Sequence, residues 1–226
     1  NLTKRHLEQF CADRKLIVKD GTIKSELMLI KRVFKIAIDK WNYGIPFNAF
    51  NGLDVPSPHK PRTRRLLSNE LSVLISYADK QRNKYISTII QFAVETGMRR
   101  SEILKLKWND VNLETGIASL YDTKNGDDRH IPLTKTAIQL LSNLTQSSEF
   151  VFPISANCLR LAWERCRNKS NIKGLRFHDL RHEAVSRFFE MGLSVPEVAL
   201  ISGHKDVRQL FRYTHLKPEN LIAKYS

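Results

Sequence analysis

The chain has 226 residues, of which 42% are hydrophobic and 27% charged, and this composition excludes disorder over most of its length. Lys and Arg outnumber Asp and Glu by 37 to 23, and the resulting net charge of +14 indicates a polyanionic partner, with nucleic acid the leading candidate. No apolar stretch approaches the roughly 20 residues that span a bilayer, so we expect no membrane partner.

The amino-terminal part predicts helices. Residues 2–14 favour a short helix, and residues 22–41 a longer one, because apolar side chains recur there at steps of three and four. Two helices bury little by themselves, so we expect this segment to be part of a helical domain. Its periodic positions are Leu27, Ile30, Val33, Phe34, Ala37 and Trp41.

Residues 44–65 are typical of a linker. They hold four of the eight prolines, which favour an extended chain. The stretch ends in a basic run that is either a strap along DNA phosphates or an ordinary solvated linker, and the pattern leaves both readings open. The run includes Lys60, Arg62, Arg64 and Arg65.

From Ser68 onward the elements follow closely. Ser68 is a candidate cap for a helix to about Lys80, and Gly97 a candidate end for a helix over 84–96. Two strands, 116–123 and 129–133, flank an Asn-Gly turn that predicts a hairpin. The expected fold class is therefore mainly α with a small antiparallel β-sheet (α+β). Its other predicted helices are 101–107, 134–143, 155–168, 179–191, 196–202 and 206–213.

Three short clusters contain candidate catalytic residues. Arg99 follows Gly97 at a sharp corner, where an arginine fork could hold a phosphate, although a structural salt bridge to Glu95 or Glu102 is the commoner explanation of such an arginine. His178 and Arg181 share one helix face, which suits phosphate binding with proton transfer, but a structural histidine is the plain alternative.

The third cluster is Gly203-His204, followed nine residues later by Tyr213. Most tyrosines only pack, and a phenol with a pKa of about 10 needs neighbouring positive charge before it acts as a nucleophile. Metal chemistry finds little support. The spacing after His182-Glu183 lacks the second histidine of a zinc motif, and the three cysteines contain no CxxC pair and fit a reducing compartment.

Taken together, these clusters resemble the conserved boxes of the tyrosine recombinase (phage integrase) family over residues 64–216. Order, spacing and residue type agree at all six positions, including a lysine in the predicted hairpin. Ser202 stands where a leucine is commoner, a departure expected to affect packing rather than chemistry. The six positions are Arg99, Lys124, His178, Arg181, His204 and Tyr213.

The resemblance implies a catalytic domain at 59–226, preceded by part of a helical core-binding domain at 1–58. It implies that Tyr213 attacks a DNA phosphodiester and forms a 3′-phosphotyrosyl link without any cofactor. Arg99 and Arg181 would stabilise the phosphate charge, and Lys124 would protonate the leaving 5′-oxygen. His178 would act as base or orienter for the tyrosine, and His204 would donate a hydrogen bond to the phosphate. Supporting and DNA-contacting roles fall to Glu102, His182, Lys60, Arg62, Arg64, Arg65 and Arg100.

The implied partner is double-stranded DNA carrying attachment sites, with four protomers on two sites and a monomer when free. The implied role is integration or excision of a mobile element in the cytoplasm of a bacterial or phage-infected cell. Two other readings remain open. A type IB topoisomerase-like enzyme shares the tyrosine chemistry, and a non-enzymatic DNA-binding regulator would use residues 193–204 as part of a helix-turn-helix.

Overall fold

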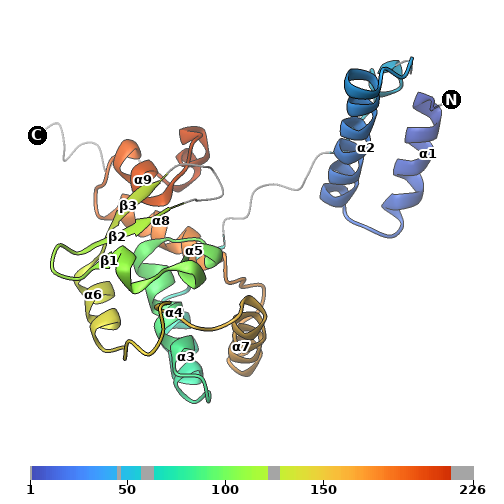
Figure 1. The fold of residues 1–226 in the computed structure, drawn as a ribbon. Coiled ribbons are helices and arrows are strands. Elements are labelled where there is room, and N and C mark those ends of the chain that lie inside the picture. Colours follow the sequence, from blue (N-terminus) through green and yellow to red (C-terminus); the bar gives the residue numbers. More distant parts are fainter. Residues whose placement is uncertain (1, 45–46, 57–63, 122–127, 215–226) are drawn as a thin grey trace, which may run out of the picture. The chain divides into compact units, whose positions relative to one another are not determined.

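The computed structural model describes residues 2–44, 47–56, 64–121 and 128–214 (Figure 1). The chain divides into two compact units, residues 1–62 and 63–226, and each has its own hydrophobic core. Among the described residues the helices outnumber the strands, and the sheet is small and antiparallel, which confirms the predicted α+β class.

The first unit is helical. Helices α1 (Lys4–Lys15) and α2 (Asp20–Trp41) pack together over Leu7, Ile23 and Leu27, and both helices were predicted. The 3₁₀ turn η1 (Phe47–Phe50) packs against the same core with Ala49 buried. The prediction of a plain linker from residue 44 was therefore wrong for this turn, whose apolar side chains have a core to bury against.

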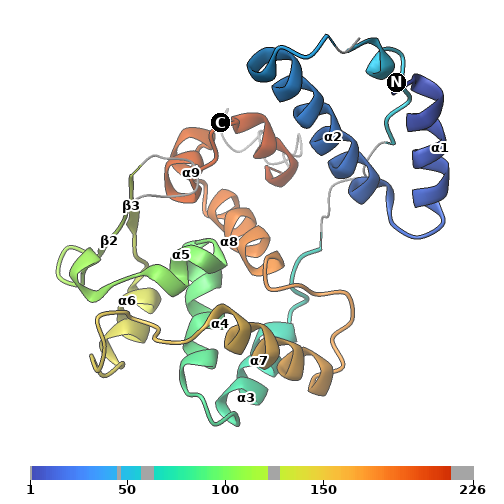
Figure 2. The ribbon, with the colours of Figure 1, turned by 45° about the vertical axis from the view of Figure 1, so that its right-hand side comes forward.

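The second unit has helix α4 (Tyr85–Thr96) near its centre, in contact with five other helices. Its buried face includes Ile86, Ile89, Ile90 and Phe92. Figure 2 shows α8 running beside α4, with α3 and α7 at the end of the unit away from α9. The remaining helices are α3 (Glu70–Asp79), α5 (Arg100–Lys105), α6 (Lys135–Ser142), α7 (Ala156–Lys169), α8 (Asp179–Glu190) and α9 (Val195–Ser202).

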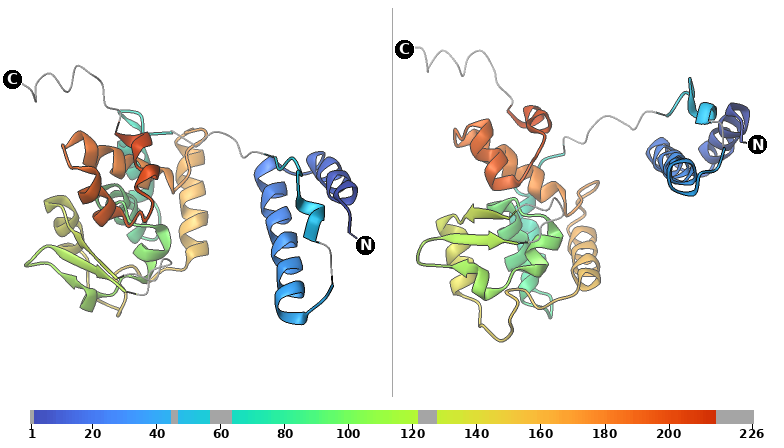
Figure 3. Two further views of the ribbon diagram at one scale, coloured as in Figure 1. Left: turned by 90° about the horizontal axis from the view of Figure 1, so that it is seen from above. Right: turned by 45° about the horizontal axis from the view of Figure 1, so that its top comes forward.

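The sheet has three antiparallel strands in the order β1 (Val111–Asn112), β2 (Ile117–Leu120) and β3 (Arg129–Pro132). Ala118 of β2 pairs with Ile131 of β3, and the side chains of both residues are fully buried. Figure 3 shows the sheet and α7 on opposite sides of the helical centre. Strand β3 also contacts α9, so the sheet borders the carboxy-terminal helices.

Three local details differ from the sequence prediction. Helix α3 is preceded by Asn69 rather than capped by Ser68, and the Glu70 carboxylate accepts the Leu67 N–H instead. The predicted helix over 206–213 forms two 3₁₀ turns, η3 (Val207–Gln209) and η4 (Phe211–Tyr213). Strand β1, only two residues long, was not predicted.

Among the described residues, no helix is both long enough and apolar enough to cross a membrane.

Candidate active site

Arg99 lies at the corner between two helices. Gly97 ends α4 with a φ of 63°, and Arg99 begins α5 in an extended conformation. The Glu102 carboxylate accepts the Arg99 backbone N–H at 2.7 Å and its guanidinium at 2.7 Å. The same guanidinium donates to the Gly203 carbonyl at 3.2 Å. Arg99 thus occupies the predicted corner. It also makes the salt bridge to Glu102 that the sequence left open as the alternative to a phosphate-binding role.

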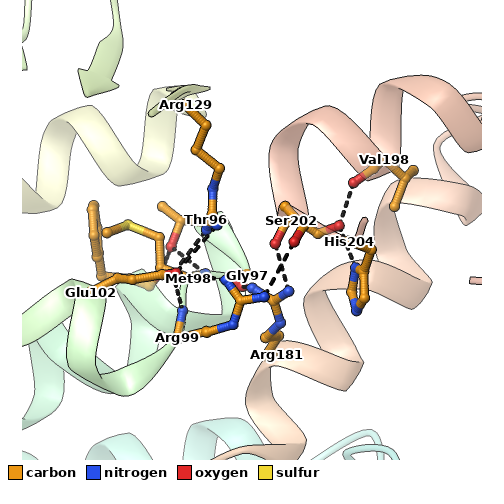
Figure 4. Close-up of polar contacts among 12 residues, drawn as sticks. Thr96, Gly97, Met98, Arg99, Glu102, Arg129, Arg181, Val198, Ser202 and His204 are labelled. Atoms are coloured by element: carbon orange, nitrogen blue, oxygen red, sulfur yellow. Dashed lines mark hydrogen bonds and ion pairs between the residues drawn. The ribbon is translucent and has the colours of Figure 1, made fainter. Parts of the chain in front are cut away.

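Arg129, on β3, shares the Glu102 carboxylate with Arg99 (Figure 4). It is 8% exposed and donates to both carboxylate oxygens of Glu102, at 3.2 and 2.8 Å. Sequence reasoning missed Arg129. The alternation along β3 contains the signal, because Arg129 and the core residue Ile131 are two apart and therefore face the same side.

Arg181, on the first turn of α8, is 4% exposed and points at two backbone carbonyls. It donates to Gly97 at 2.7 Å and to Ser202 at 2.5 Å, so one guanidinium joins the ends of α4 and α9 (Figure 4). Burial, followed by the charge of Arg99, lowers the pKa of Arg181 to about 9. The guanidinium is still protonated at neutral pH.

His204 follows the left-handed Gly203 that ends α9, and this turn brings its ring back against Ser202. The Ser202 hydroxyl lies 2.6 Å from His204 Nδ1 and donates to the Val198 carbonyl at 2.5 Å (Figure 4). Ser202 therefore contacts a candidate catalytic side chain, a contact that the expectation of a packing effect did not include. Burial, followed by Arg181, lowers the pKa of His204 to about 4.

Tyr213 ends the second 3₁₀ turn and is 6% exposed. Its hydroxyl hydrogen-bonds His182 Nδ1, and the two rings stack at 5.6 Å between centroids. The His178 ring lies 5.0 Å from His182 and is exposed at the start of α8. Among the described residues, His182 rather than His178 therefore meets the hydroxyl.

Both pKa shifts of this pair oppose proton transfer in the free protein, and they leave the histidine neutral. Burial raises the pKa of Tyr213, whereas the neighbouring Arg212 and Arg181 charges oppose that rise. Burial, followed by the charge of His178, lowers the pKa of His182 to about 4, so its ring is neutral at pH 7. A neutral imidazole with a free lone pair on Nδ1 can accept the phenol proton.

The predicted DNA contacts divide into three groups. Lys60, Arg62 and the candidate catalytic Lys124 lie outside the described residues. Arg64 pairs with Glu70, and Arg65 pairs with Glu183 and Glu190, so these two guanidiniums already face carboxylates. Arg100 is exposed beside a cavity of about 400 Å³, which is also lined by Arg160, Arg167, Arg176 and Trp163.

The cluster as a whole is electropositive. The guanidiniums of Arg99 and Arg129 both bond the Glu102 carboxylate, and the Arg181 guanidinium lies near enough to interact with its charge. Such an excess of fixed donors in a partly desolvated place suits an anion with several oxygens. The described residues contain no group of three or more His, Cys, Asp or Glu side chains placed to hold a metal ion.

Comparison with known proteins agrees with this geometry. The model of the phage integrase family matches residues 64–220, which include all three clusters. The chain belongs to the phage integrase family. Among its relatives, the shufflon-specific DNA recombinase of Escherichia coli is 38% identical over 92% of this chain. A putative integrase/recombinase of Haemophilus influenzae is 34% identical over 92% of it. The chain spans 54% and 70% of these two proteins, respectively.

Solved structures of phage integrase relatives share the fold. A lambda integrase dimer bound to a COC′ core site has a TM-score of 0.77 at 19% identity, covering 95% of this chain and 80% of the other. The Tn1549 transposon integrase, in complex with a circular intermediate DNA, has a TM-score of 0.78 at 17% identity, covering 100% of this chain and 85% of the other. At this identity the likeness shows the fold alone.

Proposed function

We propose that this chain is the catalytic part of a site-specific DNA recombinase that cleaves and rejoins strands through a 3′-phosphotyrosyl link to Tyr213. One observation carries the proposal. A buried tyrosine hydroxyl hydrogen-bonds a neutral histidine, and Arg181, whose charge acts on that phenol, also interacts with the carboxylate that Arg99 and Arg129 share. A candidate nucleophile, a candidate proton acceptor and candidate phosphate ligands are thus grouped together.

The arginines supply charge stabilisation. Negative charge spreads over the phosphate oxygens as the tyrosine attacks, and fixed guanidiniums need no reorganisation to meet it. Arg181 is held by two carbonyls and Arg99 by Glu102, so both are oriented before DNA arrives. We assign them to the non-bridging oxygens of the phosphate under attack.

His182 is our proposed acceptor of the Tyr213 proton, because its Nδ1 already contacts the hydroxyl. His178, exposed beside it, would orient His182 or contact the phosphate. His204 would hydrogen-bond a phosphate oxygen. Lys124, assigned from the family resemblance, would give a proton to the departing 5′-oxygen.

Double-stranded DNA with attachment sites is the proposed substrate, which fits the net charge of +14. Relatives include a lambda integrase bound to a core site, and this supports the choice. We propose that residues 1–58 belong to a core-binding domain and 59–226 to the catalytic domain. The proposed assembly is four protomers on two sites, acting in the cytoplasm of a bacterial or phage-infected cell to integrate or excise a mobile element.

Strand exchange tests the proposal against simple strand relaxation. The full-length protein would be incubated with two differently labelled duplexes taken from the ends of its own element. A recombinase joins a strand of one duplex to the other, whereas a topoisomerase-like enzyme reseals each strand to itself. Products carrying both labels are the expected result. Supercoil relaxation without any such product would replace the recombinase proposal with the topoisomerase one.

A further inference from the structure

Ser202 occupies an unusual position between a backbone carbonyl and a candidate catalytic histidine. It is the last residue of α9 and is fully buried. Its hydroxyl oxygen lies 2.5 Å from the Val198 carbonyl oxygen and 2.6 Å from His204 Nδ1. Both distances are short enough for hydrogen bonds, so the hydroxyl takes part in two of them at once.

Counting protons fixes the direction of both bonds. A serine hydroxyl carries a single hydrogen, and a carbonyl oxygen can only accept. The hydrogen must therefore lie on the bond to Val198, four residues earlier on the same helix. The Ser202 oxygen then accepts at its other bond, so His204 Nδ1 is the atom that carries a proton.

This tautomer has a consequence for the other ring nitrogen. A neutral imidazole has one N–H, so with the proton on Nδ1 the Nε2 atom of His204 presents only a lone pair. A lone pair repels a phosphate oxygen instead of binding it. His204 can donate to phosphate from Nε2 only after it takes up a second proton and becomes an imidazolium.

The surroundings of His204 oppose that second proton while no phosphate is bound. Burial has the largest effect on the pKa of the ring, followed by the cations Arg181, Arg99, Arg212 and Arg129, which come from α8, the residue before α5, the last 3₁₀ turn and β3. A phosphodiester placed among these arginines would supply the missing negative charge and favour the imidazolium.

We propose that Ser202 locks His204 in the Nδ1–H tautomer, so that His204 contacts the phosphate only as an imidazolium formed by taking one proton from solvent as DNA binds. Ser202 is thus a positioning residue that acts through His204. The DNA part of this proposal rests on the proposed function, whereas the tautomer is a property of the free protein.

The tautomer is measured first, in the free full-length protein, by long-range ¹H–¹⁵N correlation spectra of the histidine rings. His204→Gln identifies the signals of that ring. Wild-type protein should show the proton on Nδ1, and Ser202→Ala should move it to Nε2, the usual site in water. Ser202→Thr keeps a hydroxyl and should restore the wild-type pattern. A wild-type spectrum with the proton on Nε2 would overturn the proposal whatever the enzyme does.

The pH dependence of covalent adduct formation, on a nicked duplex from the ends of the element, then tests the DNA step. The wild-type rate should carry a component that falls on the order of tenfold per pH unit once the bound imidazolium deprotonates, because only the protonated ring can donate. Ser202→Ala should lose this component and Ser202→Thr keep it. Identical pH profiles for wild type and Ser202→Ala would refute the role at DNA.

Ser142→Ala is the matched control. Ser142 also ends its helix, α6, and donates to the carbonyl four residues earlier, at 2.9 Å. Its loss should change neither the His204 spectrum nor the pH profile. If wild-type protein has the Nδ1 proton but forms no adduct on any end, the proposed function fails and the claim about DNA falls with it, so the two failures are distinguishable.

Discussion

Hydrogen bonds hold Arg99 and Arg181 in fixed positions, and the Arg181 charge acts on the Tyr213 phenol, so each arginine should matter to chemistry more than to binding. Replacing either by alanine is expected to lower the rate of covalent adduct formation by on the order of 10²-fold, the cost of removing one preorganised charge stabiliser. Adduct yield against time on a nicked duplex measures this, with DNA affinity measured in parallel. A variant that cleaves at the wild-type rate would remove that arginine from its assigned role.

Histidines kept neutral by burial make stability depend on pH. The pKa values of His182 and His204 fall from 6.5 to about 4 on folding, so between these values the unfolded chain binds protons that the folded chain does not. The free energy of unfolding that depends on these two histidines is therefore fully present above pH 6.5, and it is lost as the pH falls towards 4.

His182→Gln tests this account of acid sensitivity. Between pH 6.5 and 4.5 the melting temperature of the variant should fall by less than that of wild type, because the variant lacks one of the two histidines whose pKa falls on folding. His130→Gln, which removes an exposed histidine of β3, should keep the wild-type dependence. Equal acid sensitivity in wild type and His182→Gln would contradict the account. The pKa values of Glu102 and Glu183 lie below normal, so protonation of these carboxylates destabilises both proteins at still lower pH.

At the site, short-range sequence signals proved sufficient for some residues and insufficient for others. The corner at Arg99 was predictable because Gly97 and the start of a helix are adjacent in sequence. The contacts of Arg129 with Glu102 and of His182 with Tyr213 were not predicted, because these partners lie 27 and 31 residues apart along the chain. Such contacts depend on tertiary packing that local patterns do not contain.

At the element scale, the residue that ends α9 must be a glycine for two reasons. Gly203 has a φ of 68°, which side chains rarely adopt, and a Cβ added there would lie 2.2 Å from Arg129 Nη1. Gly203→Ala should therefore displace Arg129 or the α9 end and reduce both melting temperature and adduct formation, by on the order of 1 kcal/mol or more in stability. Gly174→Ala, also at positive φ but with open space around it, is the control for backbone strain alone. Equal losses in the two variants would show that contact with Arg129 is unimportant.

Periodicity predicted most helices of the second unit to within a few residues, because their apolar faces repeat along several turns. It failed where elements are too short to show a period. Strand β1 has two residues, and the segment before Tyr213 breaks into two 3₁₀ turns of three residues each. Leu210 and Tyr213 are both buried and three apart, a spacing that α and 3₁₀ helices share, so the pattern could not separate them.

For the whole molecule, the net charge of +14 predicts a strong salt dependence of DNA affinity. Each phosphate that a Lys or Arg neutralises releases condensed counterions, so the affinity should fall by on the order of 10³-fold or more between 50 and 200 mM salt if six or more phosphates are contacted. Fluorescence anisotropy with a labelled duplex measures this. An affinity that barely changes with salt would contradict binding along the phosphate backbone.

The central claim is that Tyr213 attacks DNA, and a covalent trap tests it most directly. The full-length protein, and this chain beside it, would be incubated with nicked duplexes from the ends of its own element and separated on a denaturing gel. The account predicts a protein–DNA band whose peptide adduct maps to Tyr213 and which is absent for Tyr213→Phe. An adduct on another residue, or DNA binding by folded protein without an adduct on any end, would contradict it.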